Sequence, residues 1–172
     1  ALNGGVYTLS GTDANGCSNS TSALLTVHNL PSVSIGTLVP NDTVCYGTQV
    51  MIAATGSGTS YSWSGPQNIS NATPFVATNS GTYTVTASSV YACTATLTQH
   101  MQVNPLPVVS VSTVNPNDTL CSGTQLTLAG SGASTYSWSG PQSISNNTPF
   151  TASTSGNYTV TGTDGNLCSN TS

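Results

Sequence analysis

Apolar and polar residues alternate with a period of two along much of the chain. Tyr83, Val85 and Ala87 alternate with threonines, and Tyr61 and Trp63 alternate with serines. Because successive side chains of a strand point to opposite faces, the pattern predicts half-buried antiparallel strands with Gly, Pro, Asn and Asp in the turns. No segment has the spacing of an amphipathic helix. Strands are expected near residues 32–38, 49–54, 60–64, 74–77, 82–88 and 94–103, and the same set again from 108 to 163.

The sequence repeats with a period of about 75 residues. Tyr-Ser-Trp-Ser-Gly-Pro-Gln occupies residues 61–67 and 136–142, and Asn-Asp-Thr-Val-Cys at 41–45 returns as Asn-Asp-Thr-Leu-Cys at 117–121. A small β-sandwich has six or seven short strands in a unit of this length. The expected organisation is the C-terminal strands of a preceding unit in residues 1–30, a complete unit in 31–104 and a unit lacking its last strand in 105–172.

Aromatic positions favour an immunoglobulin-like sandwich over a barrel. Trp63 follows Cys45 at a spacing that suggests a core indole on the third strand. Tyr83 lies two positions after a glycine at the start of a strand, as in a tyrosine corner. The same Trp and Tyr side chains also suit a stacking platform for sugar rings, so a carbohydrate-binding module remains an alternative. The expected core aromatics are Tyr61, Trp63, Tyr83, Tyr136, Trp138 and Tyr158.

The five cysteines indicate disulfides and an oxidising compartment, because no Cys-x-x-Cys metal motif accompanies them. All are disulfide candidates, with buried free thiols as the alternative, and two connectivities are open. Pairing within units joins Cys45 to Cys93 and Cys121 to Cys168, whereas pairing across a junction joins Cys45 to Cys168. We favour the second, because the loops before the second and last strands lie at opposite poles of such a sandwich, too far apart for a cystine. The five residues are Cys17, Cys45, Cys93, Cys121 and Cys168.

Charge excludes several classes of function. The chain has no Lys or Arg, four Asp and two His. Nucleic acids and anionic membranes are bound through clustered cations, so neither is an expected partner. Schiff-base lysines and P-loops are excluded for the same reason. No apolar run is long enough to cross a bilayer, so no membrane insertion is expected.

No catalytic constellation is recognisable either. The many Ser and Thr residues have no base in a plausible motif, and the four carboxylates form no acid/base couple. Asp13 and Asp164 fit a turn between the last two strands better than a weak calcium site, which normally gathers several acidic oxygens. His28 and His100 do not recur between units and fit surface positions. We therefore expect no enzyme, no cofactor and no metal.

Several motifs together resemble a known family. They are Cys-x-Gly, Tyr-Ser-Trp-Ser-Gly, Gly-x-Tyr-Thr-Val-Thr, Gly-Thr-Asp-Ala-Asn-Gly-Cys at 11–17 and Val-Asn-Pro-Leu-Pro at 103–107. They are similar to the tandem Ig-like, PKD-like repeats of large secreted and cell-surface adhesin-type proteins of Bacteroidetes. The resemblance implies an extracellular array, often exported by the type IX system. The Asp-Thr-aliphatic motif also resembles an O-glycosylation motif of such proteins, which makes Thr43 and Thr119 candidate glycan sites; the alternative is that both loops are simply turns.

The expected function is a non-enzymatic structural array, a stalk or filament segment at the cell surface. Its expected partners are neighbouring repeats or further copies of itself, together with attached glycans. A sharper alternative is head-to-tail polymerisation, in which residues 18–28 of one copy complete the open edge of the third unit of another. The competing interpretation is that the missing strand follows in a longer polypeptide.

Overall fold

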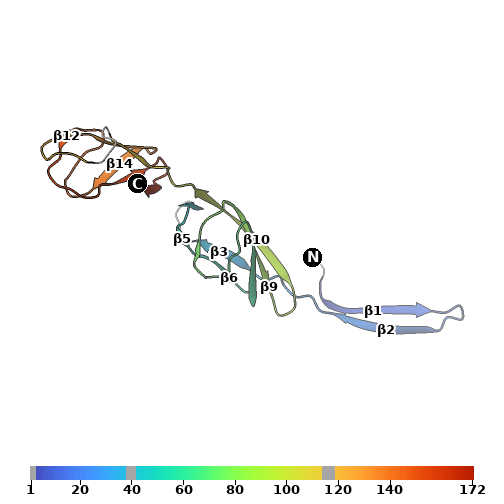
Figure 1. Ribbon diagram of the computed structural model, residues 1–172. Helices are drawn as coiled ribbons and strands as arrows, with labels where there is room; N and C mark the ends of the chain where they lie inside the picture. The colour runs from blue at the N-terminus through green and yellow to red at the C-terminus, as the bar shows by residue number, and fades with distance from the viewer. Residues whose placement is uncertain (1–2, 38–41, 114–118) are drawn as a thin grey trace.

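Every regular element is a β-strand in the computed structural model of the protein, which describes residues 3–37, 42–113 and 119–172. Three parts follow one another along an elongated molecule (Figure 1). We call them the hairpin segment (3–30), the central unit (31–104) and the C-terminal unit (105–172). Among the described residues, no helix is long and apolar enough to cross a membrane.

The hairpin segment consists of β1 (Gly5–Thr12) and β2 (Ser18–Leu25), paired antiparallel along their whole length. The Asp13 carboxylate closes its turn by accepting hydrogen bonds from the backbone N–H of Asn15 at 2.9 Å and of Cys17 at 2.8 Å. Asp164 makes the same pair of bonds in the C-terminal unit. The turn interpretation of both aspartates is therefore confirmed.

The central unit places two groups of strands around a common core, as expected for a β-sandwich. One group is a four-stranded sheet in the order β4-β10-β9-β7, and the other contains the pairs β3-β6 and β5-β8. The strands are β3 (Val33–Thr37), β4 (Thr43–Cys45), β5 (Gln49–Val50), β6 (Ile52–Gly56), β7 (Ser60–Ser64), β8 (Phe75–Val76), β9 (Gly81–Ser88) and β10 (Thr94–Asn104).

The predicted alternation is clearest in β9. Tyr83, Val85 and Ala87 are completely buried, whereas the threonines between them are half-buried. Tyr83 and residues of β4, β5, β6 and β10 form the core cluster of the unit. Burial of this apolar face is the main term that stabilises the sandwich, since the chain has no Lys or Arg to form ion pairs with its four carboxylates.

The C-terminal unit repeats the antiparallel strand pairings of the central unit, displaced by one repeat along the sequence, and its described residues contain no counterpart of the parallel pair β4-β10. Sheet β11-β13 corresponds to β3-β6, β12-β15 to β5-β8, and β14-β16-β17 to β7-β9-β10. The main difference lies in the last strand, which has 3 residues in β17 and 11 in β10. The strands are β11 (Ser110–Thr113), β12 (Gln125–Leu126), β13 (Leu128–Ser131), β14 (Thr135–Ser139), β15 (Phe150–Thr151), β16 (Thr159–Thr163) and β17 (Ser169–Thr171).

Two strand predictions need correction. The strand expected at 49–54 is divided at Met51, because β5 pairs with β8 whereas β6 pairs with β3. The chain must turn there to change its partner. Strand β4 was not predicted, and it pairs parallel to β10, with Val44 opposite Val103. An all-antiparallel arrangement was therefore wrong at this edge.

Candidate functional site: the junction between units

A disulfide joins the central unit to the C-terminal unit. Cys45 ends β4, and Cys168 follows the turn between β16 and β17; their Cα atoms are 5.5 Å apart and 123 positions separate them in sequence. The Cys168 side chain is fully buried. Of the two connectivities that the sequence left open, the structure contains the one across the junction. A buried disulfide indicates an oxidising environment.

Pairing within a unit is wrong for a geometric reason. Cys45 lies opposite Asn104, at the end of β10, whereas Cys93 immediately precedes Thr94, where the same strand begins. A strand of 11 residues is about 33 Å long at ~3.3 Å per residue. A cystine requires Cα atoms within about 7 Å. Cys45 therefore cannot reach Cys93.

The linker between the two units, residues 104–107, is anchored by a hydrogen bond at each end. The backbone N–H of Tyr46 donates to the Asn104 carbonyl at 2.8 Å, on the central side. The Asn170 side-chain amide donates to the carbonyl of the buried Pro107 at 3.0 Å, on the C-terminal side. Pro105 and Pro107 also restrict φ between these anchors. The disulfide crosses from one unit to the other, and each hydrogen bond anchors one end of the linker to the unit beside it.

Three of the five candidate cysteines are free thiols in the structure. Cys17 and Cys121 are exposed, and Cys93 is half-buried. The Cys93 Sγ lies 4.0 Å from the backbone carbonyl oxygen of His28, beside the linker that leads from the hairpin segment. His28 itself stacks on Tyr91, with ring centroids 3.4 Å apart. This first junction is thus formed by packing, without a covalent bond among the described residues.

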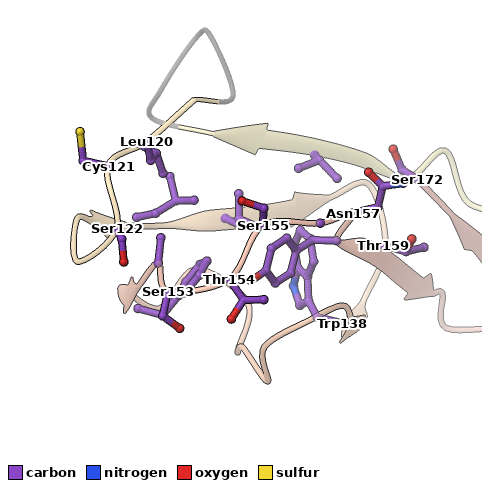
Figure 2. Close-up of a pocket in the computed structure, with 17 residues that line it drawn as sticks. Leu120, Cys121, Ser122, Trp138, Ser153, Thr154, Ser155, Asn157, Thr159 and Ser172 are labelled. Atoms are coloured by element: carbon purple, nitrogen blue, oxygen red, sulfur yellow. The ribbon is translucent and has the colours of Figure 1, made fainter.

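A groove of about 710 Å³ opens in the C-terminal unit (Figure 2). In the central unit, the counterparts of its apolar walls pack against Met101 and Val103 of β10, both of which are buried. In the C-terminal unit, β17 reaches only Thr171 because the sequence ends at Ser172, so no described residue of this chain covers these walls. The groove therefore occupies the position of the second half of β10. Its apolar walls include Leu120, Leu126, Leu128, Trp138, Phe150 and Tyr158.

The candidate core aromatics differ in burial. Tyr83 is fully buried, and this burial raises the pKa of its phenol above the ordinary value. Its hydroxyl donates to the Asn79 carbonyl at 3.3 Å, four positions upstream. Trp63 and Phe75 pack against the edge of the core cluster. The remaining candidates are half-buried: Tyr61, Trp63, Tyr136, Trp138 and Tyr158.

An asparagine that sequence reasoning overlooked positions each tryptophan. The Asn71 side-chain oxygen accepts hydrogen bonds from the Trp63 indole N–H at 3.1 Å and the Ala54 N–H at 2.6 Å, while its amide donates to the Ala54 carbonyl at 3.1 Å. Asn146 makes the equivalent bonds to Trp138 and Gly130. In the sequence, the sign of this role was that Asn, Thr, Pro and Phe recur at 71–75 and 146–150. The same residues also match the Asn-x-Thr glycosylation sequon, which occurs by chance in a chain this rich in Asn and Thr.

Both candidate glycan sites lie at the surface. Thr43 begins β4 and is exposed, and Thr119 is exposed at the equivalent position of the C-terminal unit. Asp42 precedes Thr43 with a φ of 53° and accepts a hydrogen bond from the Gln99 side-chain amide. Its counterpart Asp118 lies outside the described residues.

The histidines are both exposed, His28 in the first linker and His100 on β10. Over residues 3–37, 42–113 and 119–172, no group of three or more His, Cys, Asp or Glu side chains is close enough to hold a metal ion.

Comparison with known proteins gives no assignment. No protein-family model matches the chain, and no curated protein matches it.

Proposed function

We propose that the chain is a non-enzymatic segment of an extracellular array of tandem immunoglobulin-like units, a stalk or filament segment of a surface adhesin-type protein. Each unit corresponds to one sequence repeat of about 75 residues. The observation that carries this proposal is the Cys45–Cys168 disulfide, which ties one unit covalently to the next. Cys45 ends β4 of one unit and Cys168 precedes β17 of the next, so the bond crosses the junction and does not close either unit on itself. It resists the separation of neighbours, which is the task of a stalk.

Two further observations support the same function. The linker is short, rich in proline and hydrogen-bonded at both ends, so it does not act as a flexible hinge. The chain lacks Lys and Arg entirely, so no trypsin-type cleavage site occurs in it. Both properties suit a protein that spans an exposed and protease-rich space. The sequence resemblance to surface repeats of Bacteroidetes points to the same location.

Single-molecule pulling from the two chain ends tests the mechanical role. The disulfide closes a loop of 123 positions, which stays hidden from the applied force while the bond is intact. Reduction should therefore lengthen the fully unfolded chain by about 400 Å, at ~3.3–3.6 Å per residue. The Cys45→Ser variant should show the longer chain without reductant. An oxidised protein that already extends to full length would refute the proposal.

Head-to-tail strand donation is a second candidate function, and the groove favours it. The hairpin segment exposes an apolar face: Tyr7 is 55% exposed and Leu9 73%, whereas their counterparts Tyr83 and Val85 are completely buried. Leu25 and Val27 correspond to Met101 and Val103, the residues that fill the equivalent core. Residues 18–28 of a second copy thus carry the side chains that the groove would accept.

Sedimentation velocity distinguishes this second candidate. Polymerisation by donation should give species whose mass rises with protein concentration, and Val27→Asp should abolish them by placing a charge in the apolar groove. Val6→Asp is the matched control, because Val6 is exposed on the same hairpin and belongs to the face opposite Tyr7. A monomer at all concentrations would eliminate donation while leaving the stapled array intact.

A carbohydrate-binding module has the weakest support. Each tryptophan is half-buried, and its indole N–H is already bonded to an asparagine. A sugar-stacking platform needs an open ring face. We retain attached glycans in the proposal, at Thr43 and Thr119.

Glycosylation at these threonines is measurable by intact mass. When this 172-residue chain is expressed in the native host, its mass should exceed the 17.3 kDa calculated from the sequence, and Thr43→Ala with Thr119→Ala should remove the excess. The exposed Thr59→Ala serves as the control. Unchanged mass in the double variant would exclude these sites.

A further inference from the structure

We propose that Cys93 and Cys121 are the two unpaired halves of the same inter-unit disulfide, each taking its partner from an adjoining unit of the same type. This inference rests on the proposed function, because it requires further units on either side. It assigns a covalent role to thiols that the Cys45–Cys168 junction leaves unused. The partner is a thiol at one of two defined positions. For Cys121 it lies in the loop before the last strand of a unit, and for Cys93 it lies at the end of β4 or its counterpart.

Cys121 occupies the position of Cys45 in detail. The Thr124 N–H donates to the Cys121 carbonyl at 3.1 Å, as the Thr48 N–H does to the Cys45 carbonyl at 3.1 Å. The glycine two positions after each cysteine has a positive φ, 85° at Gly47 and 89° at Gly123. The two turns therefore present their sulfur atoms from the same backbone frame, and only one of them has a partner.

Cys93 occupies in the central unit the position that Cys168 occupies in the C-terminal unit. The Cys93 carbonyl accepts from the Ser89 N–H at 2.9 Å, and the Cys168 carbonyl accepts from the Asp164 N–H at 3.0 Å. The cysteine N–H is capped by the side chain of the same partner in both turns, Ser89 Oγ at 3.3 Å and Asp164 Oδ1 at 2.9 Å. Cys93 thus faces the hairpin segment as Cys168 faces the central unit.

The surroundings of Cys93 show where its partner would arrive. In the central unit, Cys45 lies opposite Asn104 in the register of β4 and β10. Residue 28 is the counterpart of Asn104 in the preceding linker, one repeat earlier. The Cys93 Sγ already lies 4.0 Å from the His28 carbonyl oxygen. A cysteine equivalent to Cys45 in a completed preceding unit would therefore lie beside His28, next to Cys93.

Cys121 is placed for the same reaction at the other end of the molecule. It is exposed, and in Figure 2 its sulfur points away from the other labelled side chains.

Each proposed disulfide forms by thiol–disulfide exchange with a low-molecular-weight disulfide such as oxidised glutathione. One protein thiolate attacks it and releases reduced glutathione, and the second protein thiolate then displaces the remaining glutathione. Two thiols are oxidised, and one glutathione disulfide is reduced to two thiols.

The test is a chain with its preceding unit completed. Residues 31–76 are added directly before Ala1, because residue 77 is the counterpart of residue 1, and the added segment supplies a second copy of Cys45. The protein is equilibrated with oxidised and reduced glutathione and digested with pepsin at acidic pH, where little thiolate remains to exchange disulfides. We expect the added copy of Cys45 to be joined to Cys93, although Cys17 is more exposed. The original Cys45–Cys168 bond should persist.

The unextended chain, treated in parallel, identifies the source of the partner. A bond between Cys121 of one copy and Cys93 of another supports the proposal with a second copy as partner. If Cys121 stays reduced there while the extended chain forms its bond, the partner is the next unit of one polypeptide. Cys93→Ser should leave the added Cys45 reduced, whereas Cys17→Ser should change nothing.

Two failures are distinguishable. An extended chain in which Cys45–Cys168 forms but the added Cys45 stays reduced, or bonds to Cys17 or Cys121, overturns this inference alone. Loss of the Cys45–Cys168 bond itself overturns the proposed function as well.

Discussion

Hydrogen bonds from amide side chains supply specific contacts that ion pairs supply in many other proteins. The Asn71 side-chain amide hydrogen-bonds to the Trp63 indole and to both backbone groups of Ala54. It therefore connects β6 to β7 by hydrogen bonds. Gln67 has a similar role, because its side-chain oxygen accepts from the Thr78 N–H at 3.1 Å. Amide side chains suit this task, since each supplies both a donor and an acceptor without needing a counter-charge.

We predict that Asn71→Ala destabilises the central unit by about 2–3 kcal/mol, because it leaves three partly buried polar groups without their partner. Asn68→Ala is the control, since Asn68 is exposed and belongs to the same loop. Urea denaturation followed by tryptophan fluorescence measures the difference. Equal midpoints for the two variants would show that the Asn71 network contributes nothing to stability.

At the scale of elements, the hairpin segment differs most from its counterpart. Strands β1 and β2 keep the register of β9 and β10, yet only Gly5 among their residues is not exposed. An isolated two-stranded hairpin is marginally stable in water. The same pairing in the central unit is covered by the sandwich on one face, which supplies the missing stabilisation.

Hydrogen exchange should separate the two hairpins. Amides of β1 and β2 should exchange orders of magnitude faster than those of β9 and β10, because only the latter are buried by a core. Mass spectrometry of peptic peptides at low protein concentration gives this comparison directly. Strong protection of β1 and β2 would mean that another strand or chain covers their apolar face.

Much of the element layout could be predicted from the sequence, and the failures have physical causes. Alternation in β7 and β9 identifies strands because each has one face toward the core. The break at Met51 and the parallel strand β4 depend on which partner each segment finds, and a short apolar run does not encode its partner. The Asn71 network depends on tertiary proximity, so only its recurrence at Asn146 gave a signal.

The disulfide connectivity could be predicted in part from the sequence. The opposite poles of a unit disfavoured Cys45–Cys93 and favoured the bond across the junction, which is the one that the structure contains. The sequence predicted that the C-terminal unit lacks its last strand, whereas the structure contains the first three residues of that strand as β17. The groove lies where the rest of β10 has no counterpart in this sequence. Its volume and its walls required the structure.

At the scale of the molecule, cohesion depends on apolar burial, backbone hydrogen bonds and one covalent junction. Net charge is −4 and no cation from Lys or Arg is present, so added salt has few side-chain interactions to screen. Closing a loop of 123 positions stabilises the folded state by about 4–5 kcal/mol in the chain-entropy model.

Thermal stability should therefore be nearly constant from low to high concentrations of NaCl, and it should fall sharply on reduction. Differential scanning calorimetry with and without a phosphine reductant gives both comparisons. The Cys45→Ser variant should match the reduced protein and be insensitive to reductant. A steep dependence on salt would instead assign a stabilising role to the four carboxylates.

Consecutive units are joined covalently across their junction, and the proposed stalk depends on this bond. Peptic digestion of the unreduced protein, followed by mass spectrometry, identifies the partner of Cys45 directly. We predict a linked peptide pair that contains Cys45 and Cys168 and separates on reduction. Recovery of Cys45 linked to Cys93, or of Cys45 as a free thiol in the folded protein, would contradict it.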